Sequence, residues 1–109
     1  MAQEYITLEP QNEYGTVQLN KSVFSSIALN VIEENDQVQL VEGNRPLKGG
    51  IQTVIDHNTL KLTIPVKMNY KAHVTDTCAE LQNKIFESIS YMTDFKPESI
   101  EIQVVGFIF

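Results

Sequence analysis

The stretch LKLTIPVKM, residues 60–68, holds the clearest strand pattern in the sequence. Its apolar side chains alternate with Lys61, Thr63, Pro65 and Lys67, and alternate residues of a strand face opposite sides of a sheet. One face of this strand is therefore expected to pack on a core while the other meets solvent. Pro65 has no N–H to donate to a neighbour, so we predict that the strand lies at an edge or carries a bulge.

The residues before this strand predict a hairpin and a glycine-rich loop. IQTVID (51–56) is a second strand, and DHNT (56–59) is a turn of the kind that joins antiparallel strands. EGNRPLKGG (42–50) lacks the Lys followed by Ser or Thr of a phosphate-binding loop, so its glycines serve a turn. Arg45 and Lys48 make this loop the most basic tip of an acidic chain. We name both as candidate contacts for an anionic partner, with a plain surface loop as the alternative.

Two amphipathic helices flank the hairpin region. In NKSVFSSIALNVIEEN (20–35) apolar residues recur at helical spacing, and Asn20 is a favourable N-cap residue. A strand near 16–19 precedes this helix and a short strand at 37–41 follows it. The second helix is predicted from about His73 to Met92, with an apolar stripe at steps of three and four residues.

The last strand of the chain is ESIEIQVVGFIF, residues 98–109. Up to Val104 it alternates as a half-buried strand does, with one polar face. Beyond that point apolar residues fill the face that had been polar, and we predict that they share it. These candidate interface residues are Val105, Phe107 and Phe109.

Something must cover these three side chains, because an exposed apolar strand edge is a template for pairing with another strand. The candidates are the N-terminal arm of the same chain, through Tyr5, Ile6 and Leu8, a second copy of the chain, or a different protein.

The order strand, helix, strands, helix, strand predicts an α+β fold. We expect a two-layer sandwich with both helices packed on one face of a mainly antiparallel sheet. Residues 14–109 form a single domain, and residues 1–13 form an N-terminal arm that is either an edge strand or disordered.

Composition excludes several classes of function. The chain of 109 residues has a formal net charge of −6 and scattered Lys and Arg, which disfavours binding to a nucleic acid backbone. The first residues do not resemble a secretory signal, and no window is long and apolar enough to span or anchor in a membrane. We therefore expect a cytoplasmic protein.

The sequence offers no convincing catalytic, cofactor or metal site. His57 falls in the hairpin turn and His73 at a helix start, and neither belongs to a group with the spacing of zinc ligands. Cys78 lies on the apolar stripe of the second helix, where a cysteine is usually a small buried hydrophobic residue. We expect no enzyme activity, no bound cofactor and no metal.

Five segments spread along nearly the whole chain carry a family resemblance. They are YGTVQLNKSVFSSIA, GGIQTVID, LKLTIPVKMNY, ELQNKIFESISYMTDF and ESIEIQVVGFIF. By these segments the sequence from Tyr14 to Phe109 resembles the alkaline shock protein family of Gram-positive bacteria, also called the Gls-type envelope stress response family. Two residues depart from the family pattern, since Lys71 and Asp94 stand where members commonly have Gly; Asp can adopt the left-handed conformation of a helix cap at some cost.

The resemblance implies a non-enzymatic cytoplasmic scaffold or adaptor in cell-envelope stress response and homeostasis. It implies self-association into a homo-oligomer, protein partners, and a position at the membrane held by a separate membrane-anchoring protein. It brings no catalytic residues. The alternative is a regulatory domain that binds a small metabolite or modulates an enzyme of fatty-acid or lipid metabolism, because other family members are linked to that metabolism.

Overall fold

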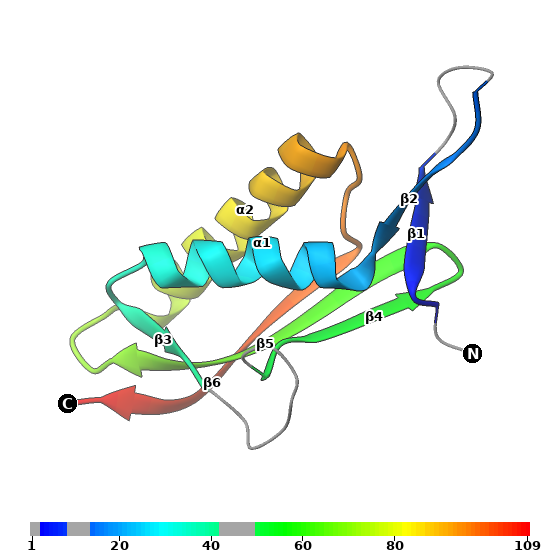
Figure 1. Ribbon diagram of the computed structural model, residues 1–109. Helices are drawn as coiled ribbons and strands as arrows, with labels where there is room; N and C mark the ends of the chain where they lie inside the picture. Colours follow the sequence, from blue (N-terminus) through cyan, green and yellow to red (C-terminus); the bar gives the residue numbers. More distant parts are fainter. Residues whose placement is uncertain (1–2, 9–13, 42–49) are drawn as a thin grey trace.

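Strand β5 (Thr59–Asn69) runs through the middle of the main sheet in the computed structural model, which describes residues 3–8, 14–41 and 50–109. All other elements are arranged around this strand (Figure 1). In chain order they are β1 (Tyr5–Leu8), β2 (Val17–Asn20), α1 (Lys21–Glu34), β3 (Val38–Leu40), β4 (Gln52–Asp56), then β5, α2 (Val74–Thr93) and β6 (Ser99–Ile108).

The main sheet has β5 between two sets of partners. On one side β4 pairs antiparallel with the first half of β5, and β3 pairs antiparallel with its second half. On the other side β6 runs parallel to β5 along almost its whole length. Because β5 and β6 are parallel neighbours, α2 forms the crossover that joins them.

The prediction that the strand containing Pro65 lies at an edge is wrong. Pro65 falls between the residues paired with β4, which end at Thr63, and those paired with β3, which begin at Val66. The Pro65 carbonyl accepts a hydrogen bond from Val41 N at 3.2 Å, so the proline nitrogen faces the same side, at the junction between the two short strands. A central strand therefore accommodates proline here. The alternative was a bulge in this strand. The pairing of β5 with β6 is irregular between Val66 and Lys67, but the extra residue belongs to β6 and not to β5.

Both helices cover the same face of the main sheet (Figure 1), which confirms the predicted α+β fold. The side chains between the layers form one core, and those of β5 at positions 60, 62, 64, 66 and 68 are almost completely buried. The helices contribute the apolar stripes predicted for them. The core residues of the helices are Phe24, Ile27, Ala28, Val31, Ile32, Leu81, Ile85 and Ile89.

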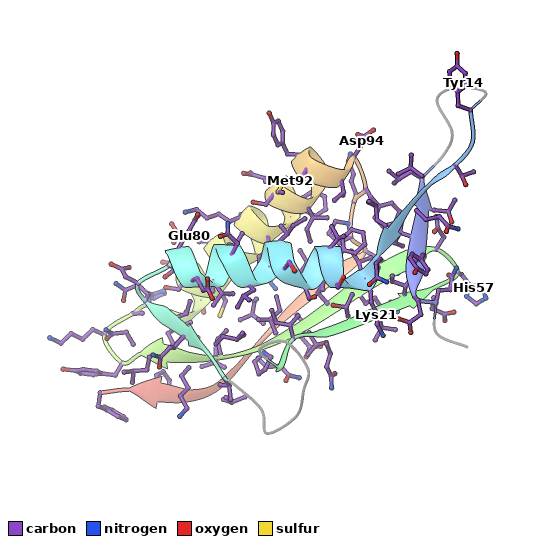
Figure 2. The ribbon with its side chains drawn as sticks, in the orientation of Figure 1. Tyr14, Lys21, His57, Glu80, Met92 and Asp94 are labelled. Carbon is purple, nitrogen blue, oxygen red and sulfur yellow. The ribbon has the colours of Figure 1, made fainter. Side chains whose placement is uncertain are left out.

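Local capping fixes the ends of the two helices. Asn20 accepts a hydrogen bond from Ser22 N at 2.9 Å, so its predicted role as N-cap of α1 is confirmed. Asp94 follows the last turn of α2 (Figure 2) and has φ 58°, the left-handed conformation expected for it.

The hairpin turn between β4 and β5 is tight. His57 and Asn58 in this turn have φ 50° and 56°. Two consecutive positive φ values are typical of the tight turns that join antiparallel strands.

The described part of the N-terminal arm lies at the hairpin end of the sheet. β1 pairs antiparallel with β2, and Gln3 N donates to the Ile55 carbonyl at 2.7 Å. Thr7 N donates to Asn58 Oδ1 at 2.9 Å, and Ile6 is fully buried in the core. The alternative in which this arm covers the end of the chain is therefore wrong for residues 3–8, which lie far from the C-terminus (Figure 1).

Candidate interface

The three candidate residues at the end of the chain are all exposed. Val105 is 55% exposed, Phe107 is 47% exposed and Phe109 is 93% exposed. Large apolar side chains gathered at one end of an edge strand are a common feature of protein interaction surfaces. We call Val105, Phe107 and Phe109 together the terminal apolar segment.

A bulge in β6 separates these side chains between the two faces of the sheet. Val104 is the partner of Val66 and Gly106 is the partner of Lys67, so Val105 is an extra residue in β6. Phe107 is the register partner of the core residue Met68, and register partners in a sheet share a face. The prediction that all three share the solvent face is therefore wrong for Phe107, because the bulge shifts the alternation by one residue.

The last residue of the chain stacks on the end of β5. The rings of Tyr70 and Phe109 have their centroids 5.4 Å apart at an interplanar angle of 29°, and Lys71 Nζ lies 5.6 Å from the centre of the Tyr70 ring. Tyr70 N also donates to the Ile108 carbonyl at 3.1 Å. Sequence reasoning missed Tyr70 as an interface residue. The signal was available in the β5–α2–β6 crossover, since parallel pairing brings the two strand ends together.

The outer edge of β6 has no partner among the described strands. Near its start, Gln82 of α2 donates from Nε2 to the Ile100 carbonyl at 3.0 Å, and Glu101 places a charge on the strand. From Val104 onward β6 carries no charged residue. Inward-pointing charges and helix contacts protect an edge strand from association, so the second half of β6 is the less protected part.

The helix layer also stops short of this edge. The core-facing residues of β6 at positions 100, 102 and 104 are only half-buried, whereas Leu62, Ile64 and Val66 beside them on β5 are 0–1% exposed. Apolar surface is thus exposed along the helix side of the edge as well as at the strand end. Covering it would contribute about 25 cal/mol for each Å² removed from water.

The other candidate and chemical residues do not add to this surface. Arg45 and Lys48, the candidate contacts for an anionic partner, lie outside the described residues. His57 and His73 are exposed, with His57 Nδ1 3.2 Å from Asp56 Oδ1 and His73 Nδ1 3.1 Å from an oxygen of the neighbouring Asp76. In residues 3–8, 14–41 and 50–109 there is no group of three or more His, Cys, Asp or Glu that could hold a metal ion.

Cys78 behaves as a packed apolar residue. It is half-buried and contacts the core from α2. Burial raises the pKa of the Cys78 thiol, because the surrounding apolar groups disfavour the thiolate. A nucleophilic cysteine needs the opposite shift.

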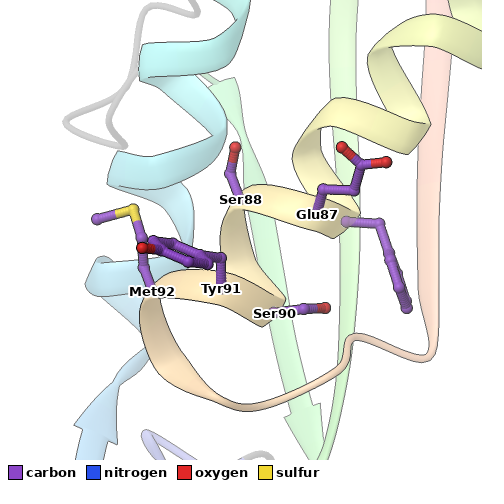
Figure 3. A pocket seen from close by; sticks show the side chains of 6 residues that line it. Glu87, Ser88, Ser90, Tyr91 and Met92 are labelled. Carbon is purple, nitrogen blue, oxygen red and sulfur yellow. The ribbon is translucent and has the colours of Figure 1, made fainter.

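A surface hollow of about 780 Å³ lies at the C-terminal end of α2 (Figure 3). The residues that line it all belong to this one helix and are Phe86, Glu87, Ser88, Ser90, Tyr91 and Met92. Tyr91 is 91% exposed, so the hollow is open to solvent. Small-molecule sites have polar groups that converge from several directions. A hollow on one helix does not provide them.

Comparison with known proteins adds two findings to this geometry. The sequence model of the alkaline shock protein 23 family, described by a cell envelope-related function, matches residues 9–109. No curated protein gives a significant match to the chain. In the part of the chain that the structure describes, neither helix has the length and apolar character needed to cross a bilayer.

Proposed function

The chain belongs to the alkaline shock protein 23 family, whose function is related to the cell envelope, and on this premise we propose that it is a non-enzymatic scaffold or adaptor in envelope homeostasis. It acts through contacts with proteins, both other copies of itself and different partners. It works on the cytoplasmic side of the envelope, where a separate membrane-anchoring protein holds it.

The observation that carries this proposal is the outer edge of β6, which has no partner among the residues that the structure describes, with the terminal apolar segment at its end. Edge strands of soluble proteins are normally blunted by charge, by proline or by a covering element. The first half of β6 has Glu101 and the contact from Gln82, but the second half has neither. An edge left open in this way supports binding by strand addition, in which main-chain hydrogen bonds supply affinity and side chains supply specificity.

The remaining chemistry supports a role without catalysis. Partial burial raises the pKa of the Cys78 thiol, and the two histidines are exposed beside single carboxylates. The family description names an envelope-related function and no reaction. The hollow at the end of α2 is lined by one helix, so it gives little support to metabolite binding and to the regulatory alternative.

The proposal is tested by a double variant, Phe107→Ser/Phe109→Ser, in cells that have no other copy of the protein. We expect a loss of tolerance to cell-wall-active antibiotics and to alkaline shock, with the variant still folded and present at normal amounts. Tyr91→Ser is the matched control, because Tyr91 is an equally exposed aromatic residue on α2, away from β6.

Normal envelope-stress tolerance in the Phe107→Ser/Phe109→Ser cells, at normal protein levels, would overturn the proposal. An equal defect in the Tyr91→Ser cells would also overturn it, because the effect would then be unrelated to the edge of β6.

A further inference from the structure

We propose that the free edge of β6 pairs antiparallel with the free edge of β6 in a second copy of the chain, about a two-fold axis that passes beside Gln103. The inference rests on the proposed function and names the partner that occupies its interface. It joins the two main sheets into one continuous sheet.

The backbone of β6 points its free hydrogen-bonding groups in the direction that this pairing needs. Pro65 O and Asn69 N both bond toward the β3 side, whereas Leu60 O accepts from Glu98 N on the β6 side, so the even-numbered residues of β5 bond toward β6. In a parallel pair, the residue directly opposite a bonded residue turns its own N–H and C=O away. The residues that are opposite in this way are Ile100, Ile102, Val104 and Phe107.

The side chains of this edge complement themselves when Gln103 lies opposite Gln103 of the partner subunit. Ile102 then faces the partner's Val104, and both are half-buried residues of the helix side. One step further, Glu101 faces the bulge formed by Val105 and Gly106. The bulge consumes one extra residue, so Ile100 next faces the partner's Phe107, which also lies on the helix side. The bulge thus brings Phe107, which is in register with the core residue Met68, opposite Ile100 on the same face of the sheet.

The charges on the solvent face are also complementary. An ideal Cβ on Gly106 would lie 3.8 Å from Cγ and 3.9 Å from Cε of Lys67, so the stem of this lysine runs alongside the glycine. Glu101 is exposed on the same face, and in the pairing it faces the bulge that contains the partner's Gly106. Lys67 and Glu101 form no ion pair within the described part of the chain. The two-fold axis brings Lys67 of each subunit to the partner's Glu101.

One contact inside the chain uses a group of this edge, and the pairing can accommodate it. Gln82 Nε2 donates to the Ile100 carbonyl, and the pairing brings the N–H of the partner's Phe107 to the same oxygen. A carbonyl oxygen has two lone pairs and can accept both donors. The pairing uses the same edge of both subunits, so it closes as a dimer. Larger assemblies need a second surface.

Disulfide trapping tests the predicted axis. In a Cys78→Ser background, Gln103→Cys places two cysteines opposite each other at a non-hydrogen-bonded antiparallel position. The Cα atoms there are about 4.5 Å apart, within the range that a disulfide spans. The control is Val54→Cys, a 47% exposed residue of β4 at the opposite side of the sheet. Mild oxidation of dilute protein should link most of the Gln103→Cys chains within minutes and leave the Val54→Cys chains monomeric.

Absence of the Gln103→Cys crosslink in a variant with an unchanged circular dichroism spectrum would overturn the inference. So would equal crosslinking of both variants, which indicates random collision, or crosslinking of Val54→Cys alone, which places the contact at β4.

Charge reversal is an independent test that leaves Cys78 in place. Rescue in a double variant separates a lost ion pair from a folding defect. Lys67→Glu and Glu101→Lys should each raise the dissociation constant of the dimer at least tenfold, measured by sedimentation velocity. The double variant should restore it to near the original value, because the ion pair is rebuilt with reversed signs. Two weakened single variants without rescue in the double variant would overturn the predicted register.

The two proposals fail in different ways. If Gln103→Cys does not crosslink while Phe107→Ser/Phe109→Ser cells lose envelope tolerance, a different protein occupies the edge; the proposed function stands and the inference falls. If the crosslink forms and the cells tolerate the stress normally, the dimer stands and the proposed function falls.

Discussion

The ring of Tyr70, one residue beyond the end of β5, stacks on the ring of Phe109, the last residue of the chain, with centroids 5.4 Å apart. The two residues are 39 positions apart in sequence (109 − 70) and meet because α2 carries the chain back so that β6 runs parallel to β5. Both rings keep large exposed surfaces, with Tyr70 52% and Phe109 93% exposed. The contact orients an apolar surface and buries little of it.

Phe109→Ala should therefore have only a small effect on folding. An exposed aromatic pair is worth about 0.5–1.5 kcal/mol at most, so the free energy of unfolding should fall by less than that. Ile64→Ala, at a fully buried position of β5, should cost about 2–5 kcal/mol. Urea unfolding followed by circular dichroism measures both. A loss for Phe109→Ala as large as that for Ile64→Ala would mean that Phe109 belongs to the core.

Asp94→Gly should stabilise the protein. Asp94 has φ 58° at the C-cap of α2, where a side chain is strained and a negative charge meets the negative end of the helix dipole. We expect a gain of about 0.5–1 kcal/mol in the free energy of unfolding. Asp94→Asn is the control, because it removes the charge and keeps a side chain that tolerates this conformation. Destabilisation by Asp94→Gly would show that the Asp94 side chain makes a contact that outweighs the strain.

The sequence was sufficient for the fold class and for most helices and strands because each of these elements carried its own local signal. Alternation marked residues 60–68, helical spacing marked both helices, and Asn20 marked the start of α1. These signals depend only on residues that are close to one another in the sequence. Pro65 predicts an edge strand or a bulge, and the edge position is wrong because two short strands meet at the proline. Strand order is a long-range property that local signals do not carry.

The candidate site was predictable only in part for the same reason. The exposed residues at the chain end were found from the failure of alternation after Val104. The bulge at Val105 was invisible, because a bulge is defined by the register with β5 and not by β6 alone. Tyr70 was missed because its partner ring comes from the other end of a crossover connection. The N-terminal arm was a candidate to cover the end of the chain. Residues 3–8 lie at the hairpin end instead, because Ile6 is buried in the main core and Thr7 bonds to Asn58.

The thiol of Cys78 should react slowly with iodoacetamide at neutral pH. Burial raises its pKa, so the thiolate fraction is lower than in an unfolded peptide of the same local sequence. The labelling rate of the folded protein should rise at a higher pH than that of the peptide.

The same shift makes stability depend on pH. Because the folded-state pKa of the Cys78 thiol is the higher one, the contribution of this thiol to stability is fully present below the pKa of the unfolded thiol and is lost as the pH rises through the folded-state pKa. Cys78→Ala should remove this part of the alkaline loss of stability. Labelling of the folded protein as fast as the peptide at pH 7 would contradict a buried thiol.

Ile6→Ala should destabilise the whole domain although it lies in the N-terminal arm. Ile6 is fully buried in the main core, so we expect a loss of about 2–5 kcal/mol in the free energy of unfolding. Tyr5→Ala is the matched control, because Tyr5 is the neighbouring residue of β1 and is 47% exposed, so its loss should be small. Association through β6 should be the same in both folded variants, since residues 3–8 contact the hairpin at the other end of the sheet. Sedimentation velocity below the unfolding transition measures this. If Ile6→Ala strengthened association while the protein remained folded, the arm would shield the interface. The claim that the protein associates through the edge of β6 would then be wrong.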